Sequence, residues 1–124
     1  KDCVNKAAVE LEWLVANTSA SKGCAVAGVA GLQKQLASGC KNEGEITIKM
    51  NNSTCFIYAA GIVGNHQGTM SDCSNSGNIA IEDYAGVDTA TSFYGGLAAK
   101  LADTATVGDD CTDTGVITIN GEAL

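Results

Sequence analysis

Apolar and polar residues alternate with a period of two along four short stretches of the chain. These stretches span residues 9–13, 46–50, 79–82 and 117–120. In the second stretch, for example, Ile46 and Ile48 flank Thr47. Successive side chains of a β-strand point to opposite faces, so the alternation predicts four strands, each with one buried and one solvated face.

A seven-residue phrase, Cys-x-Asn/Asp-x-Gly-x-Ile, leads into each of the last three strands. Its members are Cys40, Asn42, Gly44 and Ile46, then Cys73, Asn75, Gly77 and Ile79, then Cys111, Asp113, Gly115 and Ile117. A degraded copy opens the chain at Cys3 and has Ala7 where the others have Gly. Glycine at that position predicts either a corner with positive φ or a close approach of two backbones. The Asn or Asp two residues earlier can bond nearby backbone and hold this corner.

A second, glycine-containing phrase lies between the copies of the first, at residues 27–31, 60–64 and 95–99. Its glycines include Gly61, Gly64, Gly95 and Gly96. Apolar residues precede each copy, which predicts another strand with small residues where backbones crowd together. The stretch 32–37 can form a short helical turn.

Two phrases recurring in the same order define a repeat of about 35 residues. The repeats span roughly residues 3–39, 40–72 and 73–110, with a partial fourth at 111–124. One such unit cannot bury its apolar face alone, whereas stacked units share a continuous core. We therefore expect residues 1–124 to form a single all-β domain, a short β-solenoid of three to four stacked repeats. A β-prism or a sandwich-like packing of the same repeats is the alternative.

The two phrases resemble those of the GLUG-motif repeat family. That family combines Gly-Gly-Ile/Leu-x-Gly with Cys-x-Asn-x-Gly-x-Ile at about this period, and residues 60–79 match it best. The resemblance covers roughly residues 24–119, with departures at Ala7 and Ala99. It implies a part of a large secreted or surface-anchored bacterial protein, such as the adhesin-like proteins of gut Bacteroidetes or the IgA-cleaving metallopeptidases. The family supplies no catalytic residue for this segment. Because the chain starts inside a repeat, we expect it to be a piece of a longer protein.

The composition narrows the possible partners. The net charge is −7, and all seven basic residues are Lys. Nucleic-acid binding needs clustered cations, so this acidic chain is not expected to bind it. No apolar run reaches the roughly 18 residues that a membrane-spanning helix requires. A hydrophobic content of 45 % is enough to form a core and argues against disorder.

Four of the six cysteines recur at one position of the repeat, which predicts a column of buried thiols. Disulfide bonds are the alternative. Zinc sites use close pairs such as Cys-x-x-Cys, and the spacing here does not resemble them. Cys24 and Cys55 lie outside the column, and we expect them to pack in the core.

The chain offers little for catalysis, and we predict no enzyme, no cofactor and no metal site. The single histidine, His66, follows Gly64 and precedes Gly68, which favours a polar turn over a catalytic base. The acidic residues at 109–113 fit a solvated turn better than a calcium loop. Glu10 and Glu12 are on the outward face of one strand, where no cleft is expected for a glycosidase pair.

Aromatic side chains are the best candidates for a binding surface, because sugar faces stack on rings. The candidates are Trp13, Tyr58, Tyr84, Phe93 and Tyr94. Of these, Tyr84 is expected to be the best exposed, in a loop on a rigid scaffold. Residues 88–90 and 103–105 look like the Asp-Ser/Thr-small pattern of Bacteroidetes O-glycosylation.

We therefore expect a non-catalytic structural or adhesive repeat module of a secreted or outer-surface bacterial protein. Its expected partners are host glycans or extracellular proteins, together with neighbouring repeats of the same chain. The alternative is an accessory repeat segment of a surface-anchored peptidase or other hydrolase.

Overall fold

The computed structural model describes residues 1–13, 23–50, 56–83 and 92–124. This part of the chain is all-β, without a helix, and its strands assort into several mostly parallel sheets. Among the described residues no helix is long and apolar enough to cross a membrane.

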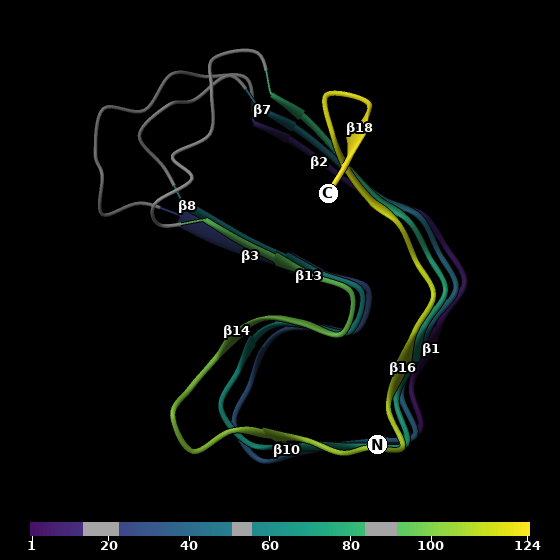
Figure 1. Cartoon of the computed structure of the whole chain (residues 1–124), viewed down its shortest axis with the longest axis vertical. Coiled ribbons are helices and arrows are strands. Elements are labelled where there is room, and N and C mark those ends of the chain that lie inside the picture. Colours follow the sequence, from purple (N-terminus) through teal and green to yellow (C-terminus); the bar gives the residue numbers. More distant parts are fainter. Residues whose placement is uncertain (14–22, 51–55, 84–91) are drawn as a thin grey trace.

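Each sheet takes one strand from each successive repeat, except that one sheet takes two strands from residues 111–124. The Asn/Asp positions lie in a sheet of β1 (Val4–Asn5), β6 (Lys41–Asn42), β11 (Ser74–Asn75) and β16 (Thr112–Asp113). The alternating stretches form the next sheet, made of β2 (Val9–Trp13), β7 (Ile46–Met50), β12 (Ile79–Asp83), β17 (Ile117–Ile119) and β18 (Glu122–Ala123). In Figure 1 the chain follows nearly the same path in each repeat.

Three further sheets complete the path of each repeat. One contains β3 (Gly23–Ala27), β8 (Phe56–Ala60) and β13 (Phe93–Gly95). The next contains β4 (Ala30–Gln33), β9 (Val63–His66) and β14 (Ala98–Leu101). The last contains β5 (Leu36–Ser38), β10 (Thr69–Ser71) and β15 (Thr106–Val107).

The register brings equivalent residues of successive repeats together. Ile79 pairs with Ile46 on one side and with Ile117 on the other, and all these ladders are parallel. The one antiparallel pair among the described strands joins β17 to β18. Its turn has positive φ at Asn120 (50°) and Gly121 (83°), the backbone that a two-residue Asn-Gly hairpin favours.

The first apolar cluster is formed by inward-facing side chains of the sheet that contains β7 and β12 and of the sheet that contains β8. In β7 the side chains of Ile46, Ile48 and Met50 are fully buried, whereas Thr47 and Lys49 are partly exposed. The expected alternation is thus confirmed there. A second apolar cluster lies beneath the remaining sheets and consists of Ala37, Cys40, Ile62, Val63, Met70 and Cys73.

Two local expectations were wrong. The stretch 32–37 is not a helical turn, since it contains the end of β4 and the start of β5, whose edges pair with β9 and β10. His66 is not a polar turn residue. It ends β9 and is fully buried, because parallel pairing with the flanking repeats extends the strand through it.

Candidate binding surface

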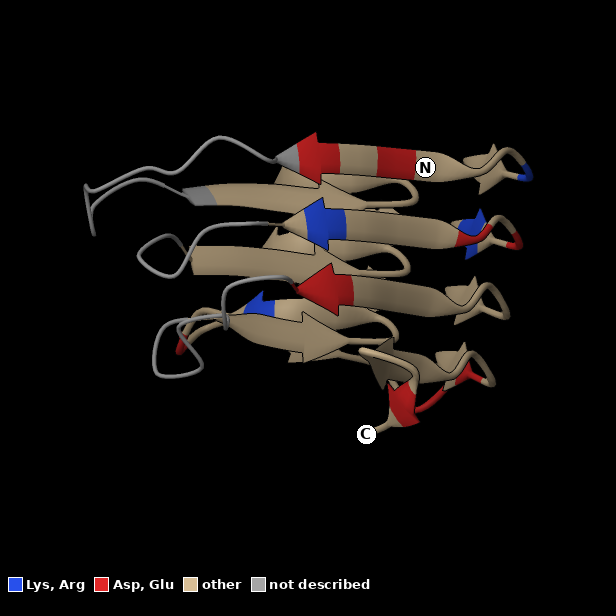
Figure 2. Cartoon of the chain, turned by 90° about the horizontal axis from the view of Figure 1, so that it is seen from above, with Lys and Arg blue, Asp and Glu red and all other residues tan. Residues whose placement is uncertain are grey.

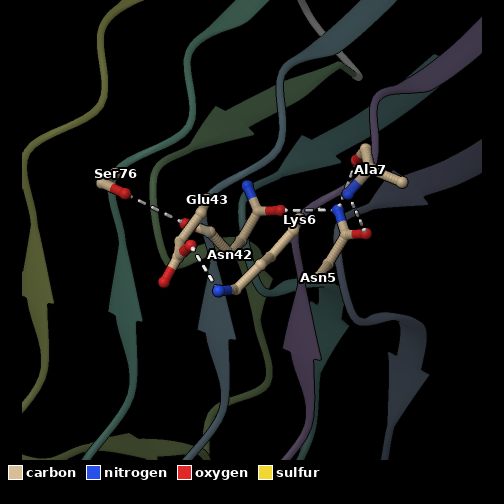
Figure 3. A network of polar contacts seen from close by, with 6 residues as sticks. All are labelled: Asn5, Lys6, Ala7, Asn42, Glu43 and Ser76. Carbon is tan, nitrogen blue, oxygen red and sulfur yellow. Dashed lines mark hydrogen bonds and ion pairs between the residues drawn. The ribbon is translucent and has the colours of Figure 1, made fainter.

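The asparagines of the first phrase form a hydrogen-bonded ladder through the interior. The Nδ2 of Asn42 donates to the Oδ1 of Asn75 at 2.8 Å, and the Nδ2 of Asn75 donates to the Oδ1 of Asp113 at 2.9 Å. Asn5 donates to Asn42 in the same way, at 2.8 Å, as Figure 3 shows. Each repeat therefore donates to the following repeat, and the ladder has a direction.

The second amide hydrogen of each asparagine holds the local corner. Asn42 donates to the carbonyl of Gly44, and Asn75 donates to that of Gly77, both at 3.0 Å. This local bond was expected from the sequence, but the bond between repeats was not. Asn42 and Asn75 are almost completely buried, so having both amide hydrogens paired matters for stability.

The glycine of the first phrase is required by close stacking rather than by a positive φ. A Cβ on Gly44 would collide with the carbonyl oxygen of Ala7, and one on Gly77 would collide with that of Gly44. Gly115 has the same relation to Gly77. Among the described glycines, positive φ occurs only at Gly39 and Gly121. Of the two explanations drawn from the sequence, the close backbone approach is therefore the correct one.

The two phrases meet across the interior, which explains why they recur together. A Cβ on Gly61 would collide with the side chain of Asn75, and one on Gly96 would collide with that of Asp113. The other two glycines of this set are also in tight contacts. Gly64 faces the carbonyl of Gly31, and a Cβ on Gly95 would collide with the carbonyl of Ala98.

The recurring cysteines Cys3, Cys40, Cys73 and Cys111 are free thiols. The inner two are buried, whereas Cys111 is partly exposed and Cys3 is exposed. The Sγ of Cys73 donates to the carbonyl of Ser71 at 3.2 Å. Burial raises the pKa of this thiol to about 11. Since the thiolate is the reactive form, the buried thiol of Cys73 suits packing rather than nucleophilic chemistry.

The remaining polar candidates do not assemble into a reactive centre in the described residues. His66 is enclosed, and its Nε2 lies 3.2 Å from the carbonyl oxygen of Thr106, so this nitrogen must carry the hydrogen. The ring cannot reach a substrate. Asp109 and Asp110 are exposed at a turn, and no group of three or more His, Cys, Asp or Glu in the described part could hold a metal ion.

An aromatic row forms the most distinctive outer surface. Phe56 and Tyr58 lie on β8, with ring centroids 5.0 Å apart, and the Tyr58 ring is 5.6 Å from that of Phe93 on β13. Phe93 is 43 % exposed. Ile57, which lies between the two aromatic residues of β8, points into the core. The row is therefore the outward face of this sheet.

A cation adjoins the row. The Nζ of Lys100 lies 5.1 Å from the centroid of the Tyr58 ring and donates to the phenolic oxygen at 3.3 Å. Contacts of this kind between a cation and an aromatic face contribute about 0.5–1 kcal/mol at exposed sites. Lys100 thus contacts the Tyr58 ring and puts a hydrogen-bond donor beside it.

The sequence located this surface only in part. Tyr58 and Phe93 were named as candidates, while Phe56 and Lys100 were missed. The period-two parity of residues 56–58 was the signal that could have found Phe56. Tyr94 is turned toward the core, and burial raises the pKa of its phenol. Tyr84, the side chain of Trp13 and residues 88–90 lie outside the described residues, whereas Asp103 and Thr104 are exposed at a turn.

The outer face of the neighbouring sheet is charged rather than aromatic. In Figure 2 a basic segment of β7 lies between acidic segments of β2 and β12. Lys49 forms ion pairs with Glu10 (3.4 Å) and Glu12 (3.6 Å), and Glu10 raises the pKa of the lysine. These charges satisfy one another at the surface, so this face is less suited to an apolar partner.

Comparison with known proteins gives no relative to reason from: no protein-family model, curated protein or solved structure matches the chain. The described residues also form no pocket. What the structure defines is an all-β chain of mostly parallel, repeat-built sheets with a row of aromatic side chains on one outer face.

Proposed function

We propose that the parallel sheets form a short β-solenoid of stacked repeats. The chain then serves as a non-catalytic structural or adhesive module of a secreted or outer-surface bacterial protein. In this proposal host glycans or extracellular proteins are bound through the aromatic row of Phe56, Tyr58 and Phe93. The resemblance of the two phrases to the GLUG-motif repeats supports the assignment to a bacterial surface protein.

The observation that carries the structural half is the asparagine ladder. The polar side chains that recur in every repeat are used for bonding between repeats in the interior. Asn42 and Asn75 are buried and hydrogen-bonded on both sides, and Asp113 accepts the last bond. Residues with this environment hold repeats in register, which is the task of a scaffold.

The adhesive half rests on the row of rings and on its neighbour Lys100. Aromatic side chains on a rigid strand have few rotatable bonds and lose little conformational entropy when a ligand binds, so they favour recognition. An exposed row of rings without a pocket suits an extended ligand that lies along it, such as a glycan chain. The Nζ of Lys100 adds a donor for ligand hydroxyl or carboxylate groups.

The test is a binding screen of the folded chain against an array of host glycans, mucins and matrix proteins. Any hit is then measured by titration for the wild type and for Tyr58→Ala, Phe93→Ala and Lys49→Ala. Lys49→Ala is the matched control, because it changes a partly exposed side chain on the neighbouring face. We expect saturable binding that weakens at least tenfold in the two aromatic variants and is unchanged in the control.

If Tyr58→Ala bound the ligand as tightly as Lys49→Ala, the aromatic row would not be the binding surface. If the chain bound no member of the array, the proposed adhesive role would be overturned, and a structural spacer would remain as its function. Circular dichroism of each variant must match the wild type, so that loss of binding is separated from loss of fold.

A further inference from the structure

The two ends of the repeat stack differ from its interior at two positions, Ala7 and Asp113. Inside the stack, each glycine of the first phrase lies directly against a carbonyl of the preceding repeat. Gly44 faces Ala7, Gly77 faces Gly44, and Gly115 faces Gly77. The Cβ direction at this position therefore always points toward the preceding repeat.

Ala7 carries the Cβ that the other three positions lack. A repeat placed before it with the same geometry would put its own carbonyl oxygen on this Cβ. The equivalent contact at Gly44 is too short for any side chain, and the obstacle there is backbone, which cannot rotate away. Ala7 thus blocks the first-repeat end sterically.

Asp113 closes the other end by its chemistry. Each inner asparagine passes one Nδ2 hydrogen to the following repeat, but a carboxylate has no hydrogen to pass on. The Oδ1 of Asp113 accepts from the Nδ2 of Asn75 and from the backbone N–H of Gly115 at 3.1 Å. A following repeat would bring its own ladder oxygen against this carboxylate, and the two would repel each other.

The edge of the largest sheet is covered at this same end. β18 folds back on β17 and pairs antiparallel with it, at the Asn120–Gly121 turn. The edge that a following parallel strand would need is thereby occupied, which is a common protection against edge-to-edge association.

We propose that Ala7 and Asp113 are stop residues, which close the stack to any further repeat at both ends, whatever precedes Lys1 or follows Leu124. The stack then makes its outside contacts through its sides, where the aromatic row lies, and not by adding repeats or copies of itself end to end. The closure depends only on the contacts between repeats at these positions, so its test does not depend on whether the chain binds a ligand.

The first-end test uses an additional copy of residues 40–72. Inserted after residue 72, this copy should join the stack, raise the urea m-value by about a quarter and protect its amides from exchange, because m follows the surface buried. Placed before Cys3 in the wild type, it should remain unprotected. Placed there in the Ala7→Gly variant, it should become protected.

The other end is tested by a chain made of residues 1–119 followed by residues 82–124, which replaces the β18 edge with another repeat. The added repeat should stay unprotected while the first Asp113 is present and become protected when this residue is Asn. Thr112→Asn, at the exposed neighbouring position, is the matched control and should leave the added repeat unprotected.

Three results would overturn the proposal. The first is an added repeat that docks as well in the wild type as in Ala7→Gly or Asp113→Asn. The second is an added repeat that fails to dock in either variant although the copy inserted after residue 72 does dock. Failure of the inserted copy itself would show that the repeats do not stack by the contacts described, and the proposal would fall with it.

Discussion

Replacing Asn75 by Ala is the most direct test of the ladder. The change removes three hydrogen bonds, namely the two that Nδ2 donates, to Gly77 and Asp113, and the one that Oδ1 accepts from Asn42. The Asp113 carboxylate is exposed and can turn to water. One Nδ2 hydrogen of Asn42 and the carbonyl of Gly77 are buried, however, and would lose their partners.

Leaving a buried polar group unpaired costs about 1–3 kcal/mol. Two such groups give about 2–6 kcal/mol for Asn75→Ala, before any cost of the void left by the side chain. A domain of ordinary stability has about 5–15 kcal/mol in all. The variant should therefore lose a large part of its stability, seen as a lower urea midpoint with an unchanged m-value.

Two controls make this prediction specific. Ser76→Ala changes the exposed neighbouring residue, whose Oγ makes only a long, 3.5 Å contact with the carbonyl of Asn42, and should stay within about 0.5 kcal/mol of the wild type. Asn75→Asp keeps the shape, but at neutral pH it supplies no donor and adds a charge beside Asp113. It should be at least as destabilising as Asn75→Ala. Burial beside a second carboxylate favours the protonated form, so this loss should shrink as the pH falls. If Asn75→Ala costs less than about 1 kcal/mol, the reasoning about unpaired groups is refuted.

Four further predictions concern stacking, the thiols and surface charge. Gly77→Ala should cost at least about 1–3 kcal/mol by overpacking, whereas Ala7→Gly should cost under about 1 kcal/mol; equal costs in urea titrations would contradict the stacking argument. Because the pKa of Cys73 is raised to about 11 from 9.0, the folded thiol keeps its proton where the unfolded one loses it. The stability that this thiol contributes is present below pH 9 and lost between pH 9 and 11. In Cys73→Ala the free energy of unfolding should therefore depend less on pH in this range than in the wild type. A thiol reagent should label Cys3 in the native protein and Cys73 only after unfolding; rapid native labelling of Cys73 would argue against its burial. Lys49→Ala should leave the urea midpoint almost unchanged, because its ion pairs are exposed, and a marked shift would show that they matter more than surface pairs usually do.

The sequence predicts the strands well because their signal is local. Alternation over five residues places Ile46 and Ile48 inside and Thr47 outside, without knowledge of any other part of the chain. His66 shows where this fails. Its neighbourhood of Gly and polar residues indicates a turn, but pairing with strands 33 and 35 residues away overrides the local preference.

The ladder and the aromatic row could be predicted only in part, because both depend on register between repeats. A local reading finds the bond from Asn42 to its own corner, but it cannot find the bond to Asn75, which is 33 residues away. Likewise, Tyr58 and Phe93 become neighbours only once β8 and β13 are aligned. The sequence alone favours Tyr84, for which a loop is expected, because exposure is easier to predict than alignment.

Unequal repeats make this register a problem that the fold must solve. The pairing offset is the difference in number between two paired residues. Between the first two repeats it is 37 where Val9 pairs with Ile46, but 33 where Gly23 pairs with Phe56. The first repeat therefore has four more residues between β2 and β3 than the second has between β7 and β8. Between the second and third repeats the offset is 35 residues where Leu101 pairs with His66, and 37 residues where Thr106 pairs with Thr69. The change falls within the turn that follows β14.

Within each strand the offset never changes, and the ladder explains why it should not. A slip of one residue would point every side chain of the strand to the opposite face. In β6 and β11 it would move Asn42 and Asn75 out of line with their partners and bring Glu43 or Ser76 toward the interior. Apolar contacts between Ile columns tolerate small shifts, whereas a chain of bonds of 2.8–2.9 Å does not. Insertions are therefore confined to the connections, and it is there that the repeats can diverge without disturbing the stack.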